Sequence, residues 1–271
     1  MLTAPVAFAQ SAPILLIPAD SRALSMGGVA LRPDVEAVEA RVQSAAWAPR
    51  SAGNSLVGVD VFYRADERVW ISLEGRLLLD RPYDATSPQG QVTGKFRPYD
   101  WTAAVGATFG LSEAFALGVK ARAVTSELAE DVRGTAYSGD VFFSYTDGRV
   151  SASLGVRNLG SQIKYGGKGY PLPALAALQG SVRPLDGLTV AAEADYLFRG
   201  ALMVGLGVEY TFAKILSLRG GYHYGDADKA IPSYASLGLG VQYAGFHVDA
   251  AYLLASQTLG NTLMIGLGYA F

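Results

Sequence analysis

From residue 55 to the C-terminus, hydrophobic residues recur at every second position, which is the period of a β-strand and not of a helix. The final stretch, NTLMIGLGYAF, shows this most clearly, because large side chains at 263, 265, 267, 269 and 271 alternate with mostly small ones. The pattern predicts thirteen strands, many of them nine or more residues long. They cover 55–64, 69–79, 99–109, 115–119, 141–145, 150–156, 174–183, 188–198, 204–212, 216–222, 237–243, 246–254 and 263–271.

The two faces of these strands differ in a way that favours a membrane. One face is aliphatic with aromatic residues at the strand ends, and the other carries glycine, serine, threonine, alanine and charges. Strands of soluble proteins average about five to six residues, whereas a tilted strand needs about nine to eleven to cross a bilayer. In lipid, only a closed barrel satisfies the backbone of every strand. We therefore predict an all-β fold, a transmembrane antiparallel β-barrel of about 14 strands.

The direction of the strands predicts one further crossing near the N-terminus. If Phe271 ends at the periplasmic side, where turns are short, strand 55–64 begins at the outer side, so that residues 20–50 must cross once. We expect MGGVALR (26–32) to be this first strand. We expect DVEAVEARVQSAAW (34–47) to form a short helix in the lumen, because Val35, Val38 and Val42 share one helical face.

The N-terminal residues resemble the end of a secretory signal. Ala7-Phe8-Ala9 before Gln10 is the small-x-small pattern of a cleavage site, although the basic region that precedes such signals is missing. An ordinary apolar N-terminus is the alternative. The predicted organisation is a signal-peptide remnant at 1–9, an N-terminal hatch segment at 10–50 with the first strand and the short helix, and the outer-membrane barrel at 51–271. The following run APILLIP (12–18) is too short to span a bilayer as a helix.

Composition excludes several classes of function. The 271 residues carry a net charge of −2, which gives no basic surface for nucleic acid. There is no cysteine and there are two histidines, His223 and His247, so we expect no metal, no cofactor and no enzyme activity. Glu193 and Asp195 share one strand face and could act as an acid–base pair. Pairing of these carboxylates with Arg183 or Arg219 is the simpler interpretation.

The inward charges have mixed sign, which predicts ion pairs that brace a largely closed lumen instead of a selective charged ring. We expect six residues to line the lumen in this way. They are Arg157, Arg183, Glu193, Asp195, Glu209 and Arg219.

The last strand has a second expected role. Tyr269 and the terminal Phe271, with apolar residues at alternate upstream positions, resemble the C-terminal signal that the barrel-assembly machinery reads. The expected partners are therefore membrane lipids and this machinery.

Several stretches resemble one family. SRALSMGG (21–28), GKFRPYDWTAAVGATF (94–109), VRNLGSQIKYGGKGYPLPA (156–174) and the C-terminal YLLASQTLGNTLMIGLGYAF are similar to parts of the PorV/PorQ family, relatives of the FadL channels. The resemblance implies a fourteen-stranded barrel in the outer membrane of Bacteroidota-type Gram-negative bacteria, with some members serving type IX protein secretion. One departure is SAAWAP (44–49), where the family has an Asn-Pro-Ala or Asn-Ala-Ala turn.

The resemblance implies a partner-binding component of an envelope complex that serves type IX secretion or related protein export and contacts other outer-membrane or secretion-complex proteins. The alternative is a FadL-like passive channel for small hydrophobic solutes. For partner binding, we expect the outer loop 160–173 to form the contact surface, since its tyrosines offer large contact area. Its candidate contact residues are Lys164, Tyr165, Tyr170 and Leu172.

Overall fold

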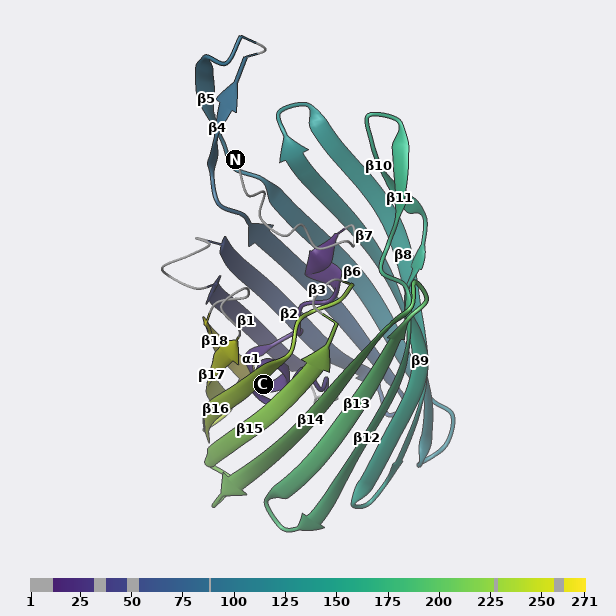
Figure 1. Cartoon of the computed structure of the whole chain (residues 1–271). Coiled ribbons are helices and arrows are strands. Elements are labelled where there is room, and N and C mark those ends of the chain that lie inside the picture. Colours follow the sequence, from purple (N-terminus) through teal and green to yellow (C-terminus); the bar gives the residue numbers. More distant parts are fainter. Residues whose placement is uncertain (1–11, 32–37, 48–53, 88, 227–228, 256–260) are drawn as a thin grey trace.

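Fourteen strands form a closed antiparallel barrel (Figure 1) in the computed structural model, which describes residues 12–31, 38–47, 54–87, 89–226, 229–255 and 261–271. Each strand pairs with the barrel strands before and after it in the chain. The strands are β1 (Val38–Trp47), β2 (Asn54–Asp66), β3 (Val69–Leu79), β6 (Tyr99–Gly110), β7 (Phe115–Ala129), β8 (Val132–Asp147), β9 (Val150–Gly160), β12 (Leu175–Leu185), β13 (Leu188–Leu197), β14 (Ala201–Phe212), β15 (Leu216–Gly225), β16 (Tyr234–Tyr243), β17 (Phe246–Ala255) and β18 (Thr262–Ala270).

Strand β1 closes the barrel, because it pairs with β18 on one side and with β2 on the other. The pairing with β18 runs from Glu39↔Ala270 to Trp47↔Thr262, so no strand edge is left open there. The prediction of an antiparallel barrel of about 14 strands is thus confirmed, and all thirteen segments with period two lie on strands.

The prediction for the first crossing was wrong in its details. Residues 38–47 form strand β1 and not a helix, because two strand edges, β18 and β2, must be hydrogen-bonded to close the barrel. Residues 26–31 lie inside the barrel and form no strand. Gly27 and Gly28 have φ values of 72° and 89°, which turn the chain out of an extended path. The predicted signal remnant at 1–9 lies outside the described residues.

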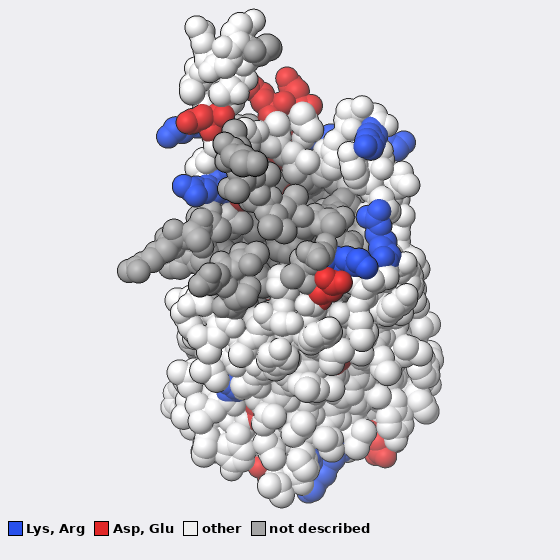
Figure 2. Space-filling model, in the orientation of Figure 1, with Lys and Arg blue, Asp and Glu red and all other residues white. Residues whose placement is uncertain are grey.

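The outer face of the barrel wall is apolar. On β18, Leu263, Ile265 and Leu267 are exposed, while Met264 and Gly266 between them are buried inside. A broad band of the surface in Figure 2 is almost free of charged residues, which gather towards the two ends. This is the surface that lipid requires.

The two ends of the barrel differ in their connections. At one end the strands are joined by tight turns such as Asp147-Gly148-Arg149, and this is the expected periplasmic side. At the other end two hairpins extend from the barrel, β4 (Tyr83–Thr86) with β5 (Val92–Phe96) and β10 (Gln162–Tyr165) with β11 (Lys168–Pro171), as Figure 1 shows. Among the described residues, no helix has the length and apolar character to cross a bilayer.

Residues 12–31, here called the plug, lie inside the barrel and occupy part of its lumen. They contain the short 3-10 helix η1 (Pro13–Leu15) and the helix α1 (Ser21–Ser25). The Asp20 side chain caps α1 by accepting a hydrogen bond from the Ala23 backbone nitrogen at 2.6 Å. The helix α1 packs against β15–β18. A short helix therefore does lie in the lumen, but it is formed by residues 21–25 and not by the predicted segment 34–47.

Candidate functional site

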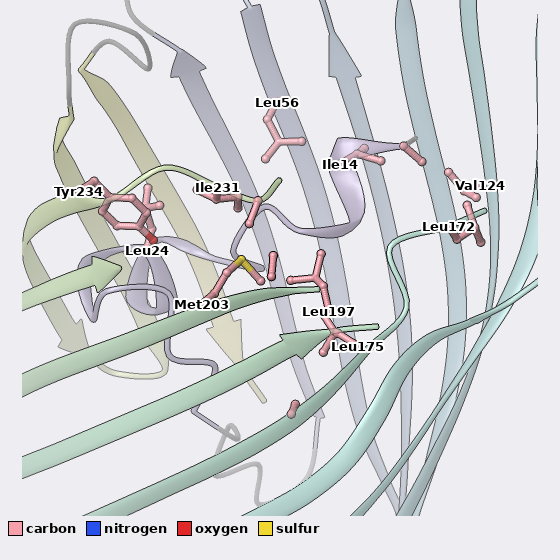
Figure 3. Packing of buried hydrophobic residues seen from close by; sticks show 14 of the residues in the cluster. Ile14, Leu24, Leu56, Val124, Leu172, Leu175, Leu197, Met203, Ile231 and Tyr234 are labelled. Carbon is pink, nitrogen blue, oxygen red and sulfur yellow. The ribbon is translucent and has the colours of Figure 1, made fainter. Parts of the chain in front are cut away.

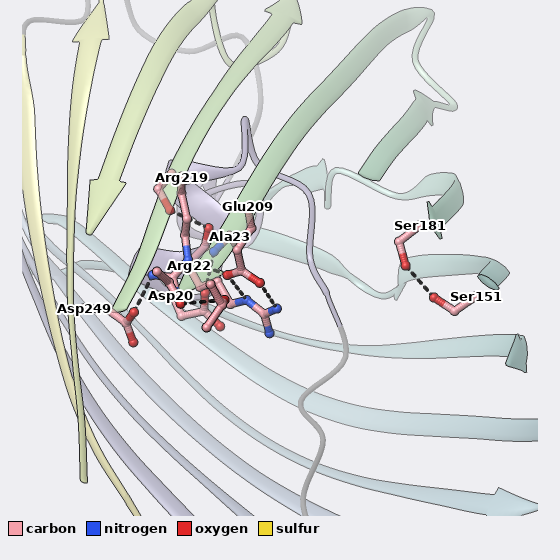
Figure 4. Close-up of polar contacts among 11 residues, drawn as sticks. Asp20, Arg22, Ala23, Ser151, Ser181, Glu209, Arg219 and Asp249 are labelled. Atoms are coloured by element: carbon pink, nitrogen blue, oxygen red, sulfur yellow. Dashed lines mark hydrogen bonds and ion pairs between the residues drawn. The ribbon is translucent and has the colours of Figure 1, made fainter. Parts of the chain in front are cut away.

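An ion-pair cluster fixes α1 to the barrel wall. Arg22 donates to both carboxylate oxygens of Glu209 on β14, with Nη2–Oε1 at 2.6 Å and Nε–Oε2 at 2.9 Å. Arg219 on β15 donates from Nε to Glu209 Oε2 at 2.6 Å and from Nη1 to Asp249 on β17 (Figure 4). Burial would lower the pKa of Arg22, but the charge and hydrogen bonds of Glu209, together with the charges of Asp20 and Asp249, raise it. The plug helix is thus held by charge-assisted hydrogen bonds.

A second polar group holds the end of the plug. The backbone nitrogen of Ala30 donates to Glu193 Oε2 at 2.8 Å, and Gln179 Nε2 donates to the Ala30 carbonyl at 2.8 Å. Arg157 neutralises Glu193 at 2.7 Å and lies 4.0 Å from Asp195. Side chains of β9, β12 and β13 therefore fix the chain that follows the two glycines.

The candidate lumen charges differ in their contacts. Arg157, Glu193, Asp195, Glu209 and Arg219 all take part in ion pairs. The partner that we expected for Glu193 and Asp195 was wrong, because the basic side chain that faces both carboxylates is Arg157, which pairs closely with Glu193. Arg183 is instead exposed beside a periplasmic turn, where its Nη2 donates to the Gly148 carbonyl at 3.2 Å. It lies too close to the end of β12 to brace the lumen.

Buried hydrophobic side chains close much of the outer end of the lumen (Figure 3). Ile14 of the plug and Leu172 from the chain after β11 both belong to this cluster. Leu172 is 4% exposed, so this candidate contact residue has little surface to offer a partner. The other labelled members are Leu24, Leu56, Val124, Leu175, Leu197, Met203, Ile231 and Tyr234.

Below this cluster, a cavity of about 350 Å³ remains between the plug and one wall of the barrel. The plug contributes apolar side chains, including Leu15, Leu16, Ile17 and Leu31. The wall contributes mostly polar residues of β2, β3, β6–β9 and β12, and one residue each of β13, β14 and β15, namely Asp195, Met203 and His223. They include Phe62, Trp70, Ser72, Glu74, Arg76, Thr108, Lys120, Arg122, Asp140, Phe142, Ser144, Tyr145, Thr146, Ser151, Ser153, Arg157, Asn158, Leu175, Ala177 and Gln179.

The cavity spans much of the barrel length. Leu175 begins β12 and Met203 lies near the start of β14, both at the outer end. Thr146 and Ser151 flank the tight turn between β8 and β9, at the opposite end. The space thus leads from the hydrophobic cluster at the mouth towards the periplasmic end.

The charged residues of this wall are paired with one another. Lys120 contacts Glu74, and Arg122 donates to Asp140 at 3.2 Å. Arg76 donates from Nη1 to the Ile17 carbonyl at 3.1 Å and so connects the wall with the plug across the cavity.

Two parts of the site were missed from the sequence. The plug residues 14–17 belong to the run that we considered only as a membrane helix, although an apolar segment preceding a capped helix is a suitable lining for a lumen. Phe142 was missed because the outward residues Val141 and Phe143 define the strand pattern. Its position as an aromatic residue on the polar face was the available signal.

The histidines do not form a metal site. His223 faces inward and stacks on Tyr234, with ring centroids 4.8 Å apart. Its Nδ1 lies 3.2 Å from the carbonyl of Gly27. In the part of the chain that the structure describes, no group of three or more histidine or acidic side chains is placed to bind a metal ion.

No family model matches the sequence, and no curated protein matches it. The fold, however, matches solved structures. CymD, a monoaromatic hydrocarbon channel, is 12% identical with a TM-score of 0.67, over 94% of this chain and 98% of that one. The toluene transporter TbuX of Ralstonia pickettii is 12% identical with a TM-score of 0.66, over 93% and 98%. A FadL homologue of Pseudomonas aeruginosa is 13% identical with a TM-score of 0.58, over 98% of both chains.

The chain therefore has the fold of FadL-type outer-membrane channels. This fold agrees with the expected transmembrane barrel. The three matched proteins are described as a transporter, a channel and a FadL homologue.

Proposed function

We propose that the protein is a bacterial outer-membrane channel for small, largely hydrophobic compounds. The observation that carries the proposal is the cavity of about 350 Å³ between the plug and the wall, which extends from the apolar mouth towards the periplasmic end. Its volume lies in the range of about 300–1,000 Å³ that small-molecule sites occupy. The similarity of fold to channels for toluene and monoaromatic hydrocarbons supports it.

The plug makes this a narrow path and not an open pore. It is fixed by Glu209 on one side and by Glu193 and Gln179 near its end, so the lumen beside α1 is filled. A small apolar solute gains free energy when it leaves water for the plug side chains that line the path. The alternative function considered for the sequence is thus the better supported one.

The experiment measures uptake of radiolabelled toluene by Gram-negative cells that lack their own hydrocarbon channel and express this protein. Ser153→Trp places a large side chain in the cavity, and Leu154→Trp places the same side chain on the exposed outer face of the same strand. We expect Ser153→Trp to reduce uptake to that of cells with an empty vector, while Leu154→Trp retains it. Uptake by an assembled Ser153→Trp barrel at the wild-type rate would contradict the proposal.

Partner binding in type IX secretion is the second candidate, together with the PorV/PorQ membership and the Bacteroidota-type source that the sequence resemblance implies. The observation that favours it is the β10–β11 hairpin. Tyr170 is 38% exposed there, and Lys168 Nζ lies 5.6 Å from the centre of its ring. An exposed aromatic residue with a neighbouring charge suits protein recognition.

A further inference from the structure

Phe142 is an aromatic ring placed on the polar inner face of the barrel. It lies on β8 between the inward residues Asp140 and Ser144. A Cβ at Gly118 on the adjacent strand β7 would overlap its ring, and a Cβ at Gly155 on β9 would lie 2.7 Å from the Phe142 Cβ. The two neighbouring strands therefore provide glycines where this ring lies against the wall. Phe142 is half-buried, and it lines the cavity.

Hydroxyl groups surround this ring. Ser144 on β8 and Ser153 on β9 are directly paired in the sheet, two positions from Phe142 and Gly155 respectively. Thr108 and Ser72, on β6 and β3, also line the cavity. Ser144 Oγ donates to the Ala116 carbonyl at 3.4 Å and Ser153 Oγ donates to Gln179 Oε1 at 3.1 Å, so both hydroxyl oxygens keep lone pairs that can accept a hydrogen bond. A pure hydrocarbon would cover these acceptors without offering them a donor, which costs free energy. A solute that carries a hydroxyl group can offer this donor.

The charges of the cavity do not favour an anion. Among the described residues that line it, four are basic (Arg76, Lys120, Arg122 and Arg157) and four are acidic (Asp20, Glu74, Asp140 and Asp195). Three of the basic side chains form ion pairs, and Arg76 donates to a plug carbonyl. A carboxylate would have to compete for these cations and would meet the nearby acidic groups.

We propose that Phe142, lying against Gly118 and Gly155, is a ring-stacking subsite for neutral single-ring aromatic compounds that carry a hydroxyl group, the phenols. Offset or edge-to-face contact with Phe142 binds the ring of the solute. The surrounding serine and threonine hydroxyls bind its hydroxyl group. This inference rests on the proposed channel function and narrows its solute class.

The test is equilibrium dialysis of the purified full-length barrel in detergent against labelled phenol, toluene and benzoate near pH 7, with protein-free micelles as the blank. We expect phenol to bind most tightly and benzoate most weakly. Phe142→Leu keeps an apolar side chain but removes the ring, and should weaken phenol binding about 2- to 12-fold, the range for one aromatic contact. Phe143→Leu, the next residue on the outer face, is the matched control and should bind phenol like the wild type.

Gly118→Ala provides a second variant that retains the ring but forces it out of position. We expect it to weaken phenol binding as Phe142→Leu does. Gly75→Ala is its control, because a Cβ at Gly75 meets no atom within 4 Å. All variants are checked for assembly by their heat-modifiable mobility in gels.

Wild-type phenol affinity in assembled Phe142→Leu, or tighter binding of benzoate than of phenol, would overturn the subsite. The channel proposal is tested separately, because it depends on toluene uptake and its block by Ser153→Trp. A barrel that transports toluene but binds phenol independently of Phe142 would retain the channel and lose this inference. A barrel that binds phenol through Phe142 without transporting it would retain the subsite and lose the channel.

Discussion

Arg22 of the plug helix and Glu209 of strand β14, 187 positions apart in the chain, form a bidentate ion pair with nitrogen–oxygen distances of 2.6 and 2.9 Å. The side chain of Glu209 is 6% exposed, and it also binds Arg219. One carboxylate thus binds two guanidinium groups, of which one belongs to the plug and the other to the wall, and Asp249 supplies the second negative charge. The same carboxylate therefore holds the plug in place and pairs with a basic residue of the wall.

This arrangement predicts unequal effects of the two obvious substitutions. Glu209→Gln leaves two guanidinium groups with Asp249 as their remaining acidic neighbour in the cluster, and should lower the free energy of unfolding by about 3–5 kcal/mol. Arg22→Gln should lower the free energy of unfolding by less, because Arg219 still neutralises Glu209. Denaturant unfolding of the barrel in detergent micelles measures both.

The control for this prediction is Arg149→Gln. Arg149 and Asp186 form an ion pair at 3.8 Å with both side chains largely exposed. Loss of this pair should cause no measurable change in the free energy of unfolding. Equal destabilisation by Glu209→Gln and Arg22→Gln would show that Glu209 does not hold the two arginines as a unit.

Because the plug fills part of the lumen, we predict that the barrel has a low ion conductance. Adding one methyl group to the plug, in Gly27→Ala, should raise this conductance. A Cβ at Gly27 would lie 2.5 Å from the Tyr222 carbonyl oxygen and 2.6 Å from that of Leu206, so Gly27→Ala cannot retain the plug against the wall. In planar bilayers we expect little steady conductance from the wild type and a clear increase from Gly27→Ala.

Gly90→Ala separates crowding from backbone strain. Gly90 has a φ of 79°, similar to the 72° of Gly27, but a Cβ there meets no atom within 4 Å. Both variants carry the strain of a left-handed alanine. The plug explanation fails if Gly90→Ala raises the conductance as much as Gly27→Ala does, or if the wild type already conducts like an open porin.

The strands could be predicted from the sequence because each one meets lipid on one face. Leu263, Ile265 and Leu267 must all point outward, and only a period of two achieves this. Strand β1 was mistaken for a helix because Val38 and Val42 are four positions apart and fit either period. These residues form a strand because the barrel closes only if they pair with both β2 and β18. Pairing with segments so distant in the chain cannot be inferred from the local sequence pattern.

The site could be predicted only in part for a similar reason. The sequence showed that Glu193 and Asp195 share a face, but not that Arg157, two strands away on β9, pairs with Glu193 and lies beside Asp195. Such partners depend on the tilt and register of neighbouring strands. The path along the wall depends further on where the plug lies, and two glycines with positive φ decide that.

The C-terminal aromatic residues predict an effect on assembly that is separate from transport. Phe271 is 73% exposed, and its ring lies 4.7 Å from that of Tyr269. Its backbone nitrogen donates to the Val38 carbonyl at 2.9 Å, at the seam between β18 and β1. Deletion of Phe271 should lower the fraction of assembled barrel in cells, while the assembled molecules transport toluene normally. Heat-modifiable mobility measures assembly, and unchanged assembly kinetics would count against the terminal signal.

The last prediction concerns the β10–β11 hairpin, for which partner binding and closure of the mouth make different demands on its side chains. Ile163 is fully buried against β8, where a Cβ at Gly134 would lie 2.7 Å from its Cγ1. Tyr165 is half-buried, and burial raises the pKa of its phenol. Its ring lies 5.9 Å from that of Tyr170, the more exposed of the two. Exchanging both tyrosines at once would therefore mix two effects.

Single substitutions separate them. Ile163→Ser should loosen the hairpin and speed its hydrogen exchange, because it buries an unpaired hydroxyl where an apolar side chain packed. Tyr170→Ser should leave that exchange unchanged, because its ring contributes exposed area. If the hairpin binds a partner, Tyr170→Ser lowers co-purification of envelope proteins and export of sorting-domain cargo while toluene uptake stays constant. Alternatively, Tyr170→Ser leaves co-purification and cargo export unchanged, and Ile163→Ser alters toluene uptake. The hairpin then closes the channel mouth, because Ile163 belongs to the same buried cluster as Leu172.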